Sequence, residues 1–195
     1  ITLAIMTLTV VSALTGDALA GANTNLPFTD TFEYYTNGTP LVNGTNGWYG
    51  SDSVIIVQTN IVRSGTKAAM IPVDGTLSNR FINIARTNVW MQMDLRPILY
   101  DGPTHPVVDT NQAGVFYINS NGNFVVHNGP ASPDSTNSTN WVTLTNFNVG
   151  TNGTNWVTIG IYDNFLQTNW DFYANGVLLT NNIGFINTSL TNFAS

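Results

Sequence analysis

Apolar and polar side chains alternate most regularly over residues 156–184, which read WVTIGIYDNFLQTNWDFYANGVLLTNNIG. A period of two is typical of a strand that buries one of its faces. A strand over 156–162 runs into a turn, and a second strand begins at Trp170. The dipeptide Asn175-Gly176 then predicts a tight hairpin, because both central residues of such a turn need a positive φ. Consecutive antiparallel strands follow from this pattern, and they indicate an all-β chain.

Short runs rich in apolar and β-branched residues, each bounded by turn residues, recur along the rest of the chain. We find no amphipathic helix of useful length after residue 20. About ten short strands at regular spacing favour a two-sheet antiparallel sandwich of jelly-roll type. At 195 residues, one such sandwich over 21–195 is the natural domain count. Besides the strands above, the runs predict strands over 28–33, 54–59, 68–73, 80–85, 89–96, 113–119, 123–127 and 141–147.

The beginning of the chain differs from the rest. Residues 1–14 form an apolar run, and the Ala-Leu-Ala at 18–20 precedes Gly21 in the manner of a signal-peptidase site. This run is shorter than the roughly 18 apolar residues that a membrane-spanning helix needs. We therefore expect an apolar, signal-peptide-like segment over 1–20, no membrane span, and a secreted or cell-surface protein. The alternative is a retained N-terminal packing helix, as in pilin-type filaments.

Composition narrows the choice of partner. Only 8% of the residues are charged and 43% are hydrophobic, so neutral Asn and Thr side chains must solvate much of the surface. A net charge of −6, with five Lys and Arg residues, argues against binding to nucleic acid. Cysteine is absent, so the chain has neither disulfides nor Cys-ligated zinc.

Several stretches of the chain together resemble a known family. They are FEYY at 32–35, NGW at 46–48, a Ser-Gly-x-Lys turn at 64–67, WVT at 156–158 and WDFYANG at 170–176. Over 28–193 the chain resembles the LamG-like, concanavalin A-like jelly-roll domains of secreted bacterial proteins, a group that includes lectins and glucanases. The resemblance implies a jelly-roll fold, recognition of carbohydrate, and an N-terminal acidic residue that can bind calcium.

The acidic residues are too scattered to predict a catalytic site. Glycosidases of the fold that the chain resembles need two carboxyl groups roughly 5–9 Å apart, with separated pKa values. Glu33 is the single glutamate, while Asp94 and Asp171 each stand alone on their predicted strands. His105 and His127 have no nucleophile motif around them. We therefore assign no catalytic residues and rank a glycoside hydrolase-like enzyme third among the possible functions.

Two of the predicted strands carry mixed aromatic and polar faces. An aromatic ring can stack on the C–H patches of a sugar, while amides and carboxylates form hydrogen bonds with its hydroxyl groups. The alternation of both strands assigns these side chains to one concave glycan-binding patch: Trp90, Gln92, Asp94, Asp171 and Tyr173. The alternative, which is the more common role of strand aromatics, is that Trp90 and Tyr173 fill the second face of the sandwich with the polar residues at its rim.

Trp48 and two N-terminal acidic residues are further candidates. Trp48 follows an Asn-Gly turn, where it would be placed to contact glycan, although packing in the core is the alternative. Calcium takes about six to eight oxygen ligands, often from carboxylates and amides. Asp30 and Glu33 lie beside an Asn-rich loop, and the family resemblance implies that an N-terminal acidic residue can be a ligand. We name both as candidate calcium ligands.

These observations favour an exported, non-catalytic module that binds a glycan or another cell-surface polymer. The alternative is a structural or adhesive extracellular protein that self-associates through open sheet edges or assembles into filaments. That alternative is physically reasonable because the unpaired backbone groups of an edge strand can pair with another chain.

Overall fold

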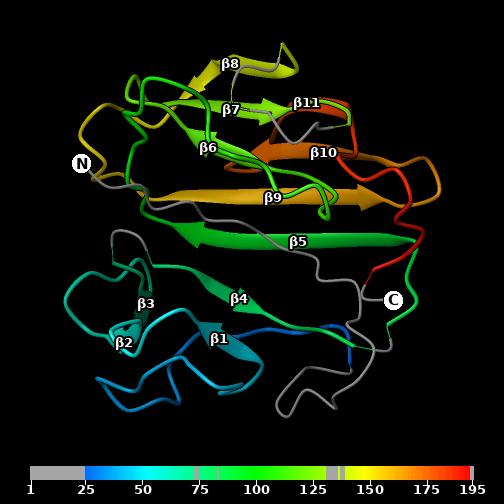
Figure 1. Ribbon diagram of the computed structural model, residues 1–195. Coiled ribbons are helices and arrows are strands. Elements are labelled where there is room, and N and C mark those ends of the chain that lie inside the picture. Colours follow the sequence, from blue (N-terminus) through cyan, green and yellow to red (C-terminus); the bar gives the residue numbers. More distant parts are fainter. Residues whose placement is uncertain (1–24, 73–74, 83, 131–135, 137–138, 194–195) are drawn as a thin grey trace.

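In this computed structural model, every regular element among the described residues is a β-strand (Figure 1). The structure describes residues 25–72, 75–82, 84–130, 136 and 139–193. The signal-peptide-like segment predicted over 1–20 lies outside these residues. No described residue belongs to a helix with the length and apolar character needed to cross a membrane.

Two antiparallel sheets form the larger part of the fold. The four-stranded sheet has the order β11-β10-β9-β5 and consists of β5 (Asn88–Leu95), β9 (Val157–Asn164), β10 (Asn169–Ala174) and β11 (Val177–Gly184). The three-stranded sheet has the order β6-β7-β8 and consists of β6 (Phe116–Ile118), β7 (Asn123–His127) and β8 (Trp141–Asn148). Figure 1 shows the long strands β5 and β9 side by side through the middle of the molecule.

The main core lies between these two sheets. Phe172 of β10 contacts Phe116 of β6 and Phe124 of β7, with ring centroids 4.9 and 5.1 Å apart. Phe124 and Phe172 are completely buried. Since burial of one such side chain stabilises a fold by roughly 1.5–3 kcal/mol, this aromatic cluster holds the sheets face to face.

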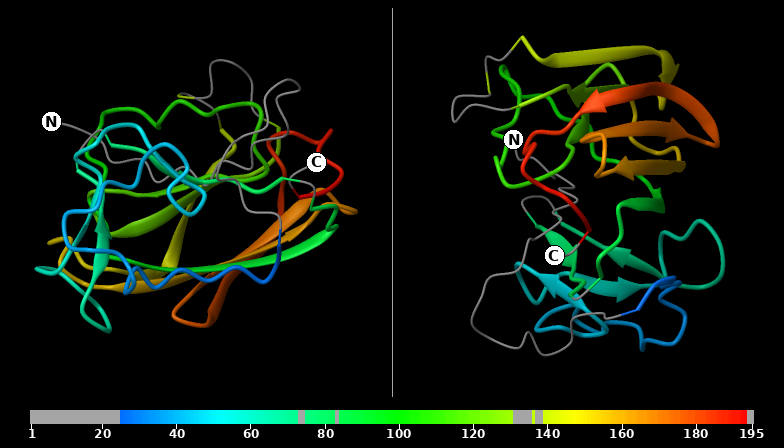
Figure 2. Two further views of the ribbon diagram at one scale, coloured as in Figure 1. Left: turned by 90° about the horizontal axis from the view of Figure 1, so that it is seen from below. Right: turned by 90° about the vertical axis from the view of Figure 1, so that its right-hand side faces the viewer.

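The remaining short strands form two small sheets below β5 in Figure 1. β1 (Trp48–Gly50) pairs with β4 (Leu77–Asn79), and β2 (Ile56–Gln58) pairs with β3 (Ala68–Met70). Together with the loops around them they make up what we call the N-terminal lobe, residues 25–72 and 75–82. This lobe has a small core of its own, which contains Tyr35, Leu41, Ile55 and Val57. Figure 2 shows the blue-to-teal lobe beside the larger pair of sheets from two further directions.

Where the two parts meet, aromatic rings form a chain of contacts. Phe81, which follows β4, packs against Phe28 with ring centroids 5.4 Å apart. Phe81 also packs against Phe193 near the C-terminal end, with centroids 5.3 Å apart. The N-terminal lobe is therefore joined to the main core by ring packing as well as by the chain itself.

The all-β class predicted from the sequence is confirmed, and so is the C-terminal hairpin. Asn175 and Gly176 connect β10 to β11 with φ values of 49° and 79°, the left-handed conformation that this turn requires. The strand predicted over 28–33 is wrong. These residues form a loop, because the Asp30 carboxylate accepts hydrogen bonds from the chain around it, including the backbone N–H of Phe32 at 2.8 Å.

Candidate functional site

The mixed face predicted for β5 points away from the main core. Val89 is buried in that core and Met91 packs against it. The alternating residues Trp90, Gln92 and Asp94 are exposed. We call the surface of the four-stranded sheet on this side the outer face.

β9 brings the other predicted residues onto the same outer face. Tyr162 of β9 is paired with Trp90 on one side and with Asp171 on the other. Gly160 is paired with Tyr173 of β10. The structure therefore gathers all the residues of the predicted patch on one face of three adjacent strands, β5, β9 and β10.

Trp90 is held in a fixed position although half of it is exposed. Its indole lies edge to face against the Tyr173 ring, with centroids 5.0 Å apart and an interplanar angle of 65°. Gly160 makes this possible, since a Cβ atom there would come within 2.9 Å of Trp90 Cζ2. The exposed fraction of Trp90 is 52%. The alternative in which Trp90 fills a covered second face of the sandwich is therefore wrong for this residue.

An arginine from the N-terminal lobe completes the polar part of the outer face. Arg63 forms an ion pair with Asp94 through Nη1 and Oδ1. The Thr158 hydroxyl, on the paired strand β9, donates to the same Asp94 oxygen at 2.8 Å. Nothing in the loop around Arg63 indicates a contact with β5, so the sequence does not predict this residue as part of the outer face.

Asp171 has a structural role in addition to its place on the outer face. Its Oδ1 atom accepts a hydrogen bond of 2.9 Å from the backbone N–H of Asn182 in β11. Asn182 has a φ of 53°, and the β10–β11 register shifts nearby. Asp171 therefore supports the irregular pairing between these strands.

Trp48 does not join the outer face. It lies in β1 of the N-terminal lobe, where it is only partly exposed. Its ring packs against Phe28 and Phe32, with centroids 6.5 and 5.5 Å away. Its Nε1–H donates to Asp30 Oδ2 at 2.7 Å. Packing in the lobe, the alternative named above, is what the structure shows for Trp48.

Asp30 organises the loop that replaces the predicted first strand. Its Oδ2 atom accepts hydrogen bonds from the hydroxyls of Tyr34 and Tyr35 at 3.0 and 3.1 Å, in addition to the bond from Trp48. Burial, with a contribution from the Asp30 charge, raises the pKa of Tyr35, so its hydroxyl stays protonated as a donor. The Asp30 carboxylate is thus already surrounded by O–H and N–H donors.

Glu33 is engaged in a similar way by the turn before β3. Thr66 donates to it through both its hydroxyl (2.6 Å) and its backbone N–H (2.8 Å), and the Lys67 backbone N–H donates at 2.9 Å. These hydrogen bonds, those of Thr66 first, lower the pKa of Glu33. A calcium ion would have to displace such donors from both carboxylates, and calcium binding stays a prediction. Among the described residues no three His, Cys, Asp or Glu side chains come together as a metal-binding group.

The two aspartates of the outer face are too far apart to act as a glycosidase pair. Their partners on β9 are Thr158 for Asp94 and Tyr162 for Asp171. Four residues along a strand and two strand spacings across a sheet separate the two Cα atoms by roughly 16 Å. Glycosidase carboxyl groups lie roughly 5–9.5 Å apart.

Both histidines pack against one tryptophan on the opposite sheet. His105 stacks on Trp141, with centroids 5.1 Å apart and an interplanar angle of 15°. His127 is completely buried and lies edge-on to the same ring at 4.9 Å. Its Nδ1–H donates to the Gly129 carbonyl at 3.1 Å. Burial lowers the pKa of each imidazole, so both are neutral at pH 7.

Comparisons of this chain with protein-family models, with curated proteins and with solved structures find no significant match.

Proposed function

We propose that this chain is an exported, non-catalytic domain that binds glycan, or another neutral cell-surface polymer, on the outer face of β5, β9 and β10. One observation carries the proposal: Trp90 is half exposed, yet Tyr173 and Gly160 fix its orientation. A ring that is ordered before binding loses little conformational entropy when a sugar stacks on it. An exposed aromatic without such support would have no comparable advantage.

The polar groups around Trp90 suit a ligand rich in hydroxyl groups. Gln92 offers an amide, and the paired Arg63 and Asp94 side chains offer a donor and an acceptor. The ion pair neutralises the charges of Arg63 and Asp94 against each other, while the Asp171 carboxylate accepts a hydrogen bond from the Asn182 backbone N–H. Hydroxyl groups of a sugar can then replace water at these side chains with little loss of hydrogen-bond energy.

The finer features of the proposal come from the sequence. Two packed antiparallel sheets are compatible with the concanavalin A-like, LamG-like jelly roll that the motifs resemble, and we propose that arrangement for 21–195. We propose export on the basis of the signal-peptide-like pattern over 1–20 and the neutral, Asn- and Thr-rich composition.

Retention of the full chain by immobilised or gel-embedded polysaccharides tests the proposed function. Trp90→Ala should weaken retention about tenfold or more, equivalent to about 1.4 kcal/mol of stacking energy. Val54→Ala is the control, because Val54 is a 52% exposed apolar side chain of the N-terminal lobe. Loss of retention in Trp90→Ala alone supports the proposal. Equal retention by the wild type and Trp90→Ala contradicts it.

Self-association through sheet edges is the second candidate, and the geometry supports it less well. β11 ends the four-stranded sheet, but the Asn146 side chain donates to the Leu179 carbonyl at 3.0 Å and Gly129 N–H donates to the Gly184 carbonyl at 3.0 Å. Part of that edge is therefore already occupied. Light scattering at increasing protein concentration distinguishes the two functions, because edge pairing requires particle size to grow without any glycan.

A further inference from the structure

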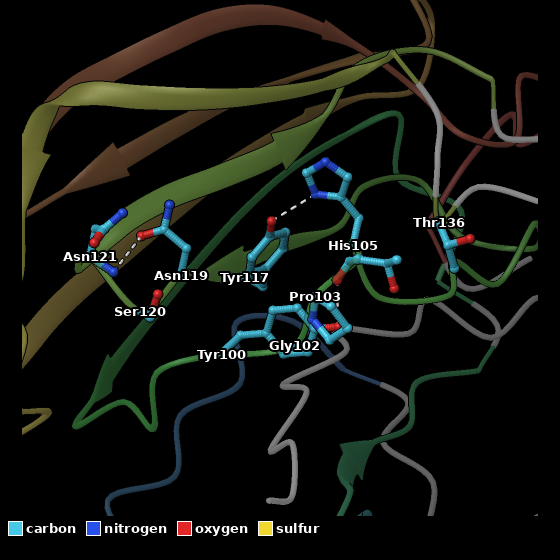
Figure 3. A pocket seen from close by; sticks show the side chains of 10 residues that line it. Tyr100, Gly102, Pro103, His105, Tyr117, Asn119, Ser120, Asn121 and Thr136 are labelled. Atoms are coloured by element: carbon cyan, nitrogen blue, oxygen red, sulfur yellow. Dashed lines mark hydrogen bonds between the residues drawn. The ribbon is translucent and has the colours of Figure 1, made fainter.

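A pocket lies on the side of the molecule opposite the outer face. The loop 97–112 folds over β6, where the Tyr100 backbone N–H donates to the Ile118 carbonyl at 2.7 Å. The loop and the β6–β7 turn line an open pocket of about 400 Å³. Figure 3 shows Tyr100, Tyr117, His105, Asn119, Ser120 and Asn121 around it.

Alternation in β6 explains why the pocket and the outer face are on opposite sides. Phe116 and Ile118 belong to the main core between the two sheets. Tyr117, between them in sequence, packs on the other side with Val115 and Trp141. The outer face and the pocket therefore belong to the two external surfaces of the pair of sheets.

The aromatic walls of the pocket are fixed by contacts within the protein. The rings of Tyr100 and Tyr117 lie edge to face, with centroids 5.2 Å apart. The Tyr100 hydroxyl donates to the Thr104 carbonyl at 2.6 Å, and the Tyr117 hydroxyl is hydrogen-bonded to His105 Nδ1 at 2.7 Å. The two rings consequently need no rearrangement to receive a ligand.

Amides and a hydroxyl supply the polar rim. Asn119 Oδ1 accepts hydrogen bonds from the backbone N–H groups of Asn121 and Asn123 at 3.1 and 3.0 Å. This contact orients the Asn119 amide and reserves its Nδ2 group as a donor. Ser120 and Asn121 are exposed at the turn beside it. The rim thus presents neutral donors and acceptors from consecutive residues.

Among the described residues that line the pocket, none carries a formal charge at pH 7, which limits the chemistry of the ligand. Besides the tyrosines, His105 is the one titratable group among these described residues, and burial lowers its pKa, so the imidazole is neutral at pH 7. A charged ligand would lose water at the rim without gaining a counter-charge. Fixed aromatic rings with a few neutral polar groups, in a pocket of this size, match a small neutral polyhydroxylated ligand.

We propose that this pocket is a second carbohydrate site, which takes one neutral sugar ring against Tyr100 and Tyr117. The inference shares its ligand class with the proposed function but rests on different residues. With sites on both external surfaces, one chain can hold two polymer strands together, and binding to a polymer network gains from multivalency.

Binding stoichiometry of the full chain tests the inference, with maltohexaose, cellohexaose and laminarihexaose as probes in calorimetric titrations. We expect two equivalents of at least one hexaose in the wild type. Tyr100→Ala removes one aromatic wall, and Ser120→Trp fills the pocket from an exposed turn without removing any contact. Each should bind one equivalent, with the affinity of the pocket reduced about tenfold or more. Trp90→Ala should also bind one equivalent, and the combination of Trp90→Ala with Ser120→Trp should bind none.

The possible results separate the two proposals. If Ser120→Trp still binds two equivalents, the pocket is not a sugar site, whatever happens to Tyr100→Ala. If Trp90→Ala binds two equivalents while Ser120→Trp binds one, the pocket inference stands and the proposed function of the outer face fails. If the wild type binds none of the hexaoses with a dissociation constant below about 1 mM, both proposals are overturned.

Discussion

Asp163 is a buried acid in the main core, and its replacement by asparagine should remove a pH-dependent loss of stability. It lies in β9, opposite Val89 of β5 and Trp170 of β10, and only 2% of it is exposed. Burial raises the pKa of Asp163 to about 7 from an ordinary value of 3.8. The folded protein therefore keeps a proton on this carboxyl over a pH range in which the unfolded chain has lost it.

The sign and size of the effect follow from proton linkage. Between about pH 4 and pH 7 the folded state binds more protons than the unfolded state, so the free energy of unfolding falls as pH rises. One pKa unit corresponds to about 1.4 kcal/mol, and the shift of Asp163 therefore costs on the order of 4 kcal/mol once the carboxyl is ionised in both states. Above about pH 7 the contribution is constant. A loss of this size is a large part of the stability of a typical domain, which is about 5–15 kcal/mol.

Urea denaturation of the wild type and Asp163→Asn at pH 5 and pH 8 measures this contribution. Asparagine keeps the shape of the side chain and stays neutral at both pH values. The advantage of Asp163→Asn over the wild type should be larger at pH 8 than at pH 5 by about 3 kcal/mol, because about two of the pKa units lie between these conditions. Taking the difference between the two proteins removes the contribution of every other titrating group. If the difference is the same at both pH values, Asp163 does not titrate as its burial requires.

Three further predictions concern Glu33, Gly160 and Arg63. Glu33→Gln should destabilise the fold more at pH 7 than at pH 3, because the lowered pKa of Glu33 gives stability that is present above pH 4.5 and lost as pH falls through the folded value. Denaturation at both pH values measures this, and an equal loss at the two would contradict it. Gly160→Ala should lower the free energy of unfolding by about 1–3 kcal/mol, because the new Cβ overlaps the indole ring of Trp90. It should also shift the NMR resonance of the Trp90 indole N–H, and an unchanged resonance would contradict the contact. Arg63→Ala should cost less than about 1 kcal/mol, because the ion pair with Asp94 is exposed; a larger loss in denaturation would show that the pair does more than orient the outer face.

The strands and turns with strict local patterns could be predicted from the sequence. The hairpin at Asn175-Gly176 was found because its turn type needs residues that tolerate positive φ, and β5 because every second residue is apolar. The same alternation predicts the residues of the outer face, because Trp90 and Asp94 are an even number of positions apart on β5 and so lie on one side of the sheet. It also contained a signal that the sequence analysis did not use. Asp163 has the parity of the apolar residues of β9, so its burial could have been predicted.

The remaining features depend on contacts between distant residues, which no local pattern encodes. Asp30 turns a predicted strand into a loop by accepting hydrogen bonds from residues as far along the chain as Trp48. Arg63 reaches Asp94 across 31 positions, from a loop with no regular period. The pocket was missed for the same reason: Tyr100 and Tyr117 meet only because the loop 97–112 folds back over β6.

In this protein, neutral Asn side chains stabilise turns and cover a strand edge, roles that charged residues often have on other protein surfaces. The low-charge composition is therefore related to the kind of ligand that we propose. Asn119 and Asn148 hold their turns through side-chain hydrogen bonds to the backbone, and Asn146 occupies part of the β11 edge. A single ion pair, between Arg63 and Asp94, is found among the described residues. Amides, hydroxyls and aromatic rings carry no formal charge, so they bind a partner through short-range hydrogen bonds and ring contacts. The same groups suit the neutral, polyhydroxylated ligand that we propose, so the residues that keep this low-charge chain hydrated would also be those that recognise it.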